Sequence, residues 1–245
     1  MTTPAPVPRR PDAGEGALLF AANRAAVAFT IARWLLHDLR NPVQMLSLLP
    51  DLVDADTGVL DPTASSALGG AVERLHEASV LLDELLRQPP PPGDLEPVDL
   101  TTALDYVSRL GVRPRMGVQL QVDPVPPGLP AARGLDYWIT QIVLNLILNS
   151  VESTADREAG IVTVRVDHVG SHLRIAVRDD GPGIPAAVRE TLFDVGVTTK
   201  RYRPVVAGLG LPVARMLAEA MGGTVRVGST GDAGTVMEAL IGTWA

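Results

Sequence analysis

The stretch WITQIVLNLILNSVEST, residues 138–154, decides the fold expected for this chain. It has the pattern of one long apolar helix, yet Gln141, Asn145 and Asn149 recur at every fourth position and therefore share a face. Asparagine is mildly unfavourable inside a helix, and a buried amide needs hydrogen-bond partners. Two interpretations stay open from the residues alone. The amides form a solvated face, or they form a floor of oxygens that suits phosphates and a hydrated Mg²⁺.

A second motif, RDDGPGIP, occupies residues 178–185. Asp179 closes an alternating strand, and Gly181 and Gly183 allow the backbone to turn and to approach a ligand closely. A carboxylate in that place can accept a hydrogen bond from an exocyclic amine, such as that of adenine. The alternative interpretation is an ordinary Asp-Gly turn.

A third motif, AGLGLP, spans residues 207–212 and opens a helix. Gly208 and Gly210 leave backbone N–H groups bare at the helix N-terminus, which is a favourable place for an anion. The preceding loop, LFDVGVTTKRYRP at residues 192–204, carries Lys200 within a cluster of basic residues. Such a loop suits a lid over a nucleotide. The alternatives are a tightly packed helix start and an ordinary solvated charge run.

The order of these motifs, closed by Gly234-Thr235 before the last strand, resembles the ATP-binding domain of sensor histidine kinases. That domain is a left-handed α/β sandwich, the Bergerat fold, which also occurs in gyrase, chaperone and mismatch-repair ATPases. The resemblance covers roughly residues 95–245. It implies that Asn149, together with Asn145, serves Mg²⁺ and the phosphates and that Asp179 receives the adenine amine. The nucleotide-binding residues that it implies are Asn145, Asn149, Glu152, Asp179, Gly181, Gly183, Lys200, Gly208, Gly210 and Thr235, with Asn149 as the metal ligand.

Three departures from the family pattern accompany this resemblance. Val206 and Ala207 replace the usual Gly and Thr at the end of the lid, and the loop before it lacks a second aromatic residue. Glu152 stands where many members carry a basic residue. These differences concern lid motion and nucleotide affinity more than the fold.

The first third of the chain is predicted to be a helical hairpin. Apolar residues spaced by three or four form two seams, over residues 31–49 and 68–86, and Pro62 suits the first turn of the second helix. A hairpin alone buries little apolar surface, so the seams favour a dimeric four-helix bundle. The proline run QPPPPGD, residues 88–94, is the clearest boundary. The predicted parts are a disordered tail at 1–14, the dimerising hairpin at 15–88, a linker at 89–93 and the ATP-binding domain at 94–245.

The segment LLHDLRNPVQ, residues 35–44, resembles the phosphoacceptor box of the same kinases, His-Glu/Asp-x-Arg-x-Pro. Helical geometry agrees, because His37 lies about 200° around the helix from the seam and so points away from it. The resemblance implies that His37 accepts the phosphoryl group, with Asp38 as general base and Asn41 orienting water when a partner's phospho-aspartate is hydrolysed. His76 is also followed by an acid but lacks the Arg and Pro, and it is interpreted as structural.

The predicted fold class is an α-helical hairpin, as a dimeric four-helix bundle, followed by an α+β sandwich of the Bergerat ATPase type. The predicted function is autophosphorylation of His37 with ATP and Mg²⁺, then transfer to an aspartate in the receiver domain of a response regulator. Phosphatase activity is a further expectation. Two alternatives stay open: a non-catalytic histidine phosphotransfer scaffold with a degenerate ATP-binding domain, and a serine kinase of the anti-sigma type.

Composition adds expectations about partners and location. The net charge of −7 argues mildly against nucleic acid as a partner, and the lack of cysteine excludes disulfides and thiolate catalysis. The sequence contains no run of about 18 uninterrupted apolar residues, so no membrane span is expected. We therefore expect a cytoplasmic homodimer.

Overall fold

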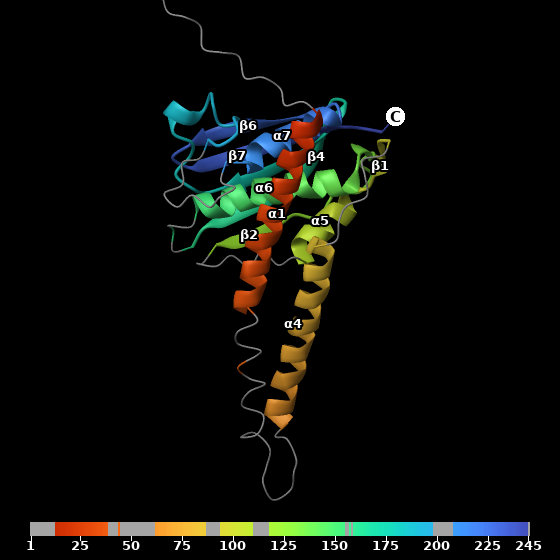
Figure 1. The fold of residues 1–245 in the computed structure, drawn as a ribbon, viewed down its shortest axis with the longest axis vertical. Coiled ribbons are helices and arrows are strands. Elements are labelled where there is room, and N and C mark those ends of the chain that lie inside the picture. The colour runs from red at the N-terminus through yellow and green to blue at the C-terminus, as the bar shows by residue number, and fades with distance from the viewer. Residues whose placement is uncertain are drawn as a thin grey trace, which may run out of the picture. The chain divides into compact units, whose positions relative to one another are not determined.

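The computed structural model describes residues 13–38, 44, 62–86, 94–109, 118–154, 157, 159–197 and 208–244. The chain divides into two compact units, one made of Met1–Val27 with Pro90–Ala245 and the other of Ala28–Pro89. The first unit contains all the described strands (Figure 1).

A five-stranded mixed sheet forms the centre of the first unit. Its strands, in spatial order, are β2 (Gln119–Val122), β4 (Ile161–Val169), β5 (His172–Asp179), β7 (Gly234–Gly242) and β6 (Thr224–Gly231). β2 and β4 are parallel, and every other neighbouring pair is antiparallel. The alternating stretch HLRIAVRD, residues 172–179, predicts β5 with these bounds. The alternating stretch IVTVRV, residues 161–166, predicts β4, which continues three residues past it.

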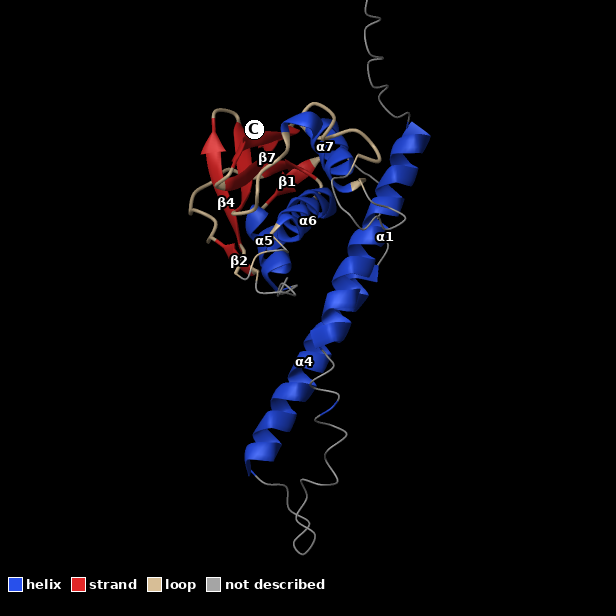
Figure 2. Cartoon of the chain, turned by 90° about the vertical axis from the view of Figure 1, so that its left-hand side faces the viewer, coloured by secondary structure: helices blue, strands red, loops and turns tan. Residues whose placement is uncertain are grey.

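Three helices cover one face of this sheet, as Figure 2 shows. They are α5 (Leu100–Arg109), α6 (Asp136–Ser153) and α7 (Gly210–Ala220). Because side chains alternate along a strand, every second residue, such as Val164, Ile175 and Met237, is buried against the helices. α6 is the central helix, and all of its residues from 141 to 148 are buried. This arrangement is the predicted α+β sandwich.

Two smaller elements close the ends of the sandwich. β1 (Glu96–Val98) pairs antiparallel with β3 (Ala132–Gly134), and an isolated bridge joins Ala132 to Thr243. A short 3₁₀ helix, η1 (Ala186–Val188), follows the second motif.

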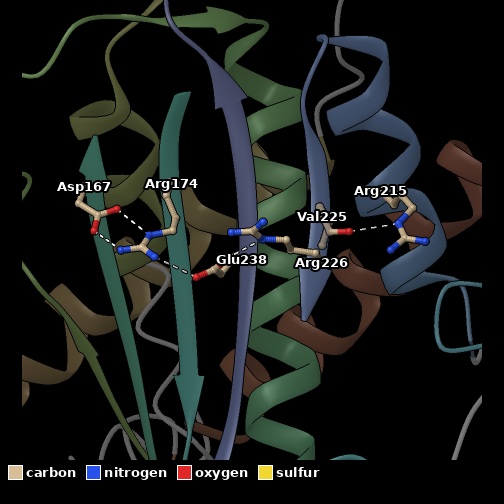
Figure 3. A network of polar contacts seen from close by, with 6 residues as sticks. All are labelled: Asp167, Arg174, Arg215, Val225, Arg226 and Glu238. Atoms are coloured by element: carbon tan, nitrogen blue, oxygen red, sulfur yellow. Dashed lines mark hydrogen bonds and ion pairs between the residues drawn. The ribbon is translucent and has the colours of Figure 1, made fainter. Parts of the chain in front are cut away.

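The sheet face that points away from the helices carries a row of charges (Figure 3). Glu238 on β7 is buried and accepts hydrogen bonds from Arg174 Nη1 at 3.1 Å and from Arg226 Nε at 2.8 Å. Arg174 also binds Asp167 on β4 through two nitrogens. The hydrogen bond from Arg174 lowers the pKa of Asp167. The buried carboxylate of Glu238 is therefore paired on both sides, as a buried charge requires.

The N-terminal third contains two long helices, α1 (Ala13–Asp38) and α4 (Pro62–Leu86). α4 begins at the predicted Pro62. α1 was expected to continue to about residue 49, but the chain after Asp38 lies mostly outside the described residues. Along the predicted seams Ile31 is buried, whereas Val72 is 53% exposed. The hairpin and its dimer stay predictions.

α1 also bears on the predicted absence of a membrane span. Its segment Gly14–Arg33 has 20 residues and a mean hydropathy of 1.2, which suffices to cross a bilayer by length and composition. The expectation of no span counted only uninterrupted apolar runs, and Asn23 and Arg24 interrupt this one. A core helix or a signal sequence passes the same test of composition. The cytoplasmic location therefore stays a prediction.

Candidate nucleotide-binding site

The carboxylate of Asp179 lies buried at the end of β5. Its Oδ1 accepts hydrogen bonds from the N–H of Gly181 at 2.9 Å and from the N–H of Thr235 at 3.3 Å. Asp179 also faces Thr235 in the register of β5 and β7. The carboxylate is thus tied both to the turn that follows it and to the neighbouring strand, and neither bond uses Oδ2.

The surroundings of Asp179 favour a ligand that donates hydrogen bonds. Burial raises the pKa of this carboxyl. The two backbone N–H groups and the hydroxyls of Ser150 and Ser153 act in the opposite direction, with the smaller effect. The hydroxyl of Ser150 is buried, and Ser153 Oγ donates to the Ser150 carbonyl at 2.8 Å. A donor group on a ligand would satisfy these poorly solvated oxygens.

The glycines around Asp179 allow backbone segments to approach each other. Gly183 has a φ of 78°, and a Cβ there would lie 2.5 Å from the carbonyl oxygen of Gly231. Gly234 has a φ of 113°, and its Cβ would lie 1.9 Å from the carbonyl oxygen of Asp179. A Cβ at Gly181 would lie 2.8 Å from Asp179 Oδ1. The sequence predicted close approach to a ligand, and the described residues show close approach of the turn to the β6–β7 hairpin.

The hydroxyl of Thr230, which was not predicted as a site residue from the sequence, binds this turn to β6. Thr230 Oγ1 accepts a hydrogen bond from the N–H of Ile184 at 2.7 Å and lies 3.2 Å from the hydroxyl of Thr235. Thr235, a predicted site residue, therefore contributes its N–H to Asp179 and its hydroxyl to the support of the turn.

The two ends of the predicted lid meet at Gly196 and Gly208. The N–H of Gly196 donates to the carbonyl of Gly208 at 3.1 Å. Gly208 has a φ of 79°, and a Cβ there would lie 2.7 Å from the carbonyl oxygen of Val197. Lys200, with the rest of residues 198–207, lies outside the described residues, so its role stays a prediction.

Two of the amides on α6 bond to a residue that was not predicted from the sequence, Asn23 on α1. Asn23 Nδ2 donates to Asn145 Oδ1 at 2.9 Å, and Asn145 Nδ2 donates to Asn23 Oδ1 at 2.9 Å. Gln141 Nε2 donates to the same Asn23 oxygen at 3.0 Å. All three side chains are buried, so a solvated face is the wrong interpretation for Gln141 and Asn145. The sequence signal that could have identified Asn23 is its lone amide in the largely apolar stretch AANRAAVAF, residues 21–29.

Helix α6 nevertheless brings the three motifs together. A Cβ at Gly210, the first residue of α7, would lie 3.4 Å from Asn145 Oδ1. A Cβ at Gly181 would lie 2.9 Å from Ser153 Oγ, one turn beyond Asn149. The helix N-terminus of the third motif and the turn of the second motif therefore both border α6, and the half-buried Asn149 lies between these contacts along the helix.

The remaining predicted residues divide between described and undescribed positions. His37 and Asp38 belong to α1, but their side chains and all of Asn41 lie outside the described residues. Glu152 is exposed on α6. His76, which was interpreted as a structural histidine, is exposed on α4.

The donor set suits Mg²⁺ only in combination with a phosphate ligand. Among the residues that the structure describes, no three His, Asp or Glu side chains gather as a metal site. Mg²⁺ commonly takes one or two protein oxygens and completes its shell with phosphates and water. The half-buried amide of Asn149 fits that requirement as one oxygen donor.

Residues 134–242 match the family described as histidine kinase-, DNA gyrase B- and HSP90-like ATPases. The chain is 29% identical over 224 residues to the C4-dicarboxylate transport sensor protein DctB of Rhizobium meliloti, covering 89% of this chain and 35% of DctB. It is 33% identical over 230 residues to the sensor histidine kinase AruS of Pseudomonas aeruginosa, covering 85% of this chain and 22% of AruS. The chain thus spans well under half the length of either relative.

Solved structures show the same fold. The solved chain of the mycobacterial sensor histidine kinase MprB is 25% identical, with a TM-score of 0.51, and the match covers 61% of this chain and 97% of the solved MprB chain. Full-length ShkA in complex with AMPPNP is 27% identical, with a TM-score of 0.52 over 88% of this chain and 46% of ShkA. The histidine kinase ThkA, solved in complex with the response regulator TrrA, is 19% identical with a TM-score of 0.50. The match covers 90% of this chain and 63% of the solved ThkA chain, and at this identity it shows the fold alone.

These matches confirm the predicted resemblance to sensor histidine kinases and the Bergerat type of the ATPase domain. The relatives are transferases, in agreement with the predicted enzyme class.

Proposed function

Residues 134–242 belong to the family of histidine kinase-, DNA gyrase B- and HSP90-like ATPases, and on that premise we propose that this chain is an ATP-dependent histidine kinase. It phosphorylates His37 and passes the phosphoryl group to an aspartate of a response regulator. The observation that carries the nucleotide part is the buried Asp179, whose Oδ1 is held by the N–H groups of Gly181 and Thr235. Its Oδ2 is the acceptor for the adenine amine.

The phosphates of ATP bind between α6 and the N-terminus of α7. The bare N–H groups at Gly210 and the partial positive charge of the helix end favour an anion there. Asn149 supplies the oxygen that holds Mg²⁺, and Lys200 in the lid adds a positive charge. When bound, Mg²⁺ offsets charge on the phosphates.

Phosphoryl transfer uses the box at residues 35–44. One nitrogen of the neutral His37 imidazole attacks the γ-phosphorus, so that a P–N bond forms while the bond to the leaving ADP oxygen breaks. Asp38 accepts the proton from the other ring nitrogen. In a separate phosphatase reaction, Asn41 orients the water that attacks the regulator's phospho-aspartate, which releases inorganic phosphate and restores the aspartate.

The partners are a response regulator receiver domain and a second copy of this chain. ThkA, which shares the fold, has been solved with a response regulator. For the homodimer, the support is the apolar seam of α4, where the exposed Val72 gives a second hairpin an apolar side chain to cover.

Labelling with γ-labelled ATP and Mg²⁺ tests the proposal. We expect an acid-labile label that is lost in His37→Ala and kept in His76→Ala, because His76 is an exposed histidine followed by an acid on the second long helix. Absence of label together with absence of ATP binding by calorimetry would reject the kinase. An acid-stable label would instead indicate the serine kinase.

A second candidate function is the phosphotransfer scaffold without catalysis. Two observations favour it: the altered lid end at Val206 and Ala207, and the engagement of Asn145 by a protein side chain. The scaffold predicts that His37 receives label from a phosphorylated receiver domain but not from ATP. The kinase predicts label from both sources.

A further inference from the structure

The N-terminal half of α1 forms part of the same compact unit as the ATPase domain. Its residues Gly16, Phe20, Asn23 and Val27 are spaced by four, three and four, so they share one helix face. A Cβ at Gly16 would lie 3.3 Å from the sulfur of Met216 on α7. This face of α1 therefore borders α7 at one end.

The same face of α1 also borders α6. The rings of Phe20 and Tyr137 lie with centroids 6.4 Å apart in a tilted arrangement. One turn further, Asn23 bonds to both Gln141 and Asn145. α1 thus contacts the two helices that border the proposed phosphate site.

The bond between Asn23 and Asn145 is reciprocal, because each amide gives its nitrogen to the other's oxygen. Asn145 therefore uses one N–H and one lone pair of its oxygen on Asn23, and both side chains are buried. Asn145 Oδ1 also lies next to Gly210, at the N-terminus of α7. A phosphate bound at that helix end would therefore lie beside the same amide.

We propose that α1 residues 13–27 are a built-in competitor of the nucleotide, with Asn23 occupying the amide of Asn145 until ATP displaces it. The inference rests on the proposed function, since it assigns a regulatory state to the same site. In one state Asn145 bonds to Asn23, and in the other it faces the nucleotide. The apparent ATP affinity is then the intrinsic affinity multiplied by the fraction of molecules in which α1 has released the site.

A reversible crosslink tests this competition. Because the chain has no cysteine, only the two introduced thiols can react with the reagent. Cysteines introduced as Gly16→Cys and Met216→Cys are joined by a short reducible dithiol reagent. AMPPNP binding is then measured by calorimetry before and after reduction. We expect the crosslinked protein to bind at least about tenfold more weakly and reduction to restore binding. The control is Gly16→Cys alone, treated with the same reagent, which should bind as the reduced protein does.

The outcomes separate the two proposals. Equal AMPPNP binding in the crosslinked and reduced protein would overturn the competition and leave the proposed function intact. Absence of binding in both forms would overturn the proposed function. Failure of the two cysteines to crosslink, although each reacts with a thiol label, would show that α1 does not rest on α7 and would also overturn the competition.

A second variant tests the role of the Asn23 side chain without a crosslink. We expect Asn23→Ala to tighten AMPPNP binding about tenfold, because the blocked fraction is removed. In an Asn145→Ala background, the same change should have no effect on affinity. Leu18→Ala, on an exposed position of the same helix, is the control and should leave affinity unchanged. A gain that persists in the Asn145→Ala background would contradict a competition for that amide.

Discussion

The carboxylate of Asp179 affects both the stability of the fold and the proposed binding of the nucleotide. Burial raises its pKa, because the ionised carboxylate is poorly solvated there. For a group with a raised folded pKa, the stabilising contribution is full below the unfolded value of about 3.9 and is lost as the pH rises through the folded value. The charged form of Asp179 therefore costs stability, as expected at a site that is selected for binding.

Asp179→Asn separates these two effects. We expect the variant without nucleotide to unfold at a higher temperature than the original protein at pH 7, because the amide oxygen still accepts from Gly181 and Thr235. The difference should shrink as the pH falls toward 4. A thermal unfolding series from pH 7 to pH 4 measures it, and a difference that does not change with pH would contradict the assignment.

The same variant should lose nucleotide affinity. In Asp179→Asn the new side-chain nitrogen is a donor that faces the adenine amine, which also donates, so one hydrogen bond is lost and two donors oppose each other. We expect about 100-fold weaker ATP binding by calorimetry, in line with about 1–3 kcal/mol for an unsatisfied buried group. Unchanged affinity would remove Asp179 from the adenine site.

Gly234 is a residue at which an added side chain should strongly lower the free energy of unfolding. Its φ of 113° disfavours any side chain, and a Cβ would lie 1.9 Å from the carbonyl oxygen of Asp179. We expect Gly234→Ala to lower the free energy of unfolding by about 3 kcal/mol, measured in denaturant. Gly242→Ala is the matched control, because that glycine ends the same strand and has open space around it. Its effect should stay within about 0.5 kcal/mol.

At the scale of an element, β7 joins the two faces of the sheet. Its inward residues Met237 and Ala239 fill the core, while the outward Glu238 is buried between Arg174 on β5 and Arg226 on β6. A carboxylate in this position links three strands at once. The neighbouring Asp167 gives Arg174 a second partner, so this arginine stays paired if Glu238 is neutralised.

We expect Glu238→Gln to lower the free energy of unfolding by about 1–2 kcal/mol, because Arg226 loses its charged partner and a buried acceptor becomes a donor on one side. The control is Arg165→Gln, which breaks the exposed pair between Arg165 and Asp123. Its effect should stay within about 0.5 kcal/mol, since exposed pairs contribute little. Equal effects of the two substitutions in urea unfolding would show that burial adds nothing to the Glu238 pairs.

Local patterns predicted the elements that pack on one face of a layer. Alternation in residues 161–166 and 172–179 predicted β4 and β5, because every second side chain meets the helices. The Gly-x-Gly of the third motif predicted the start of α7, which begins at Gly210. The three- and four-residue strands β1, β2 and β3 were not predicted, because runs so short carry no readable period.

The candidate site was predictable only where its contacts are local. Asp179 and Gly181 are two residues apart, so the turn that joins them is visible in the sequence. Asn23 and Asn145 are separated by 122 residues, and a single asparagine in an apolar helix does not name its partner. The amide stripe on α6 was therefore recognised as unusual, but the residue that satisfies two of its members was not.

At the scale of the whole molecule, two placements of α1 exclude each other: a helix that spans a membrane and a helix that bonds to α6. By length and composition its segment Gly14–Arg33 can cross a bilayer. The amide of Asn23, however, bonds to Gln141 and Asn145, which belong to a helix at the centre of the ATPase unit. Lipid offers an amide no such partner, so a helix cannot cross the hydrocarbon and make these bonds at the same time.

We expect the bonded state to prevail and the chain to appear in the supernatant after high-speed centrifugation of a lysate. Asn23→Leu should shift it toward the membrane fraction, because this change removes the bonds to α6 and makes the segment more apolar. Ser79→Leu, at an exposed position on α4 outside the candidate segment, serves as the control and should leave the distribution unchanged. If the original protein sediments with membranes and resists alkaline carbonate extraction, then α1 is an anchor, and the contact between Asn23 and Asn145 does not form in the membrane-bound protein.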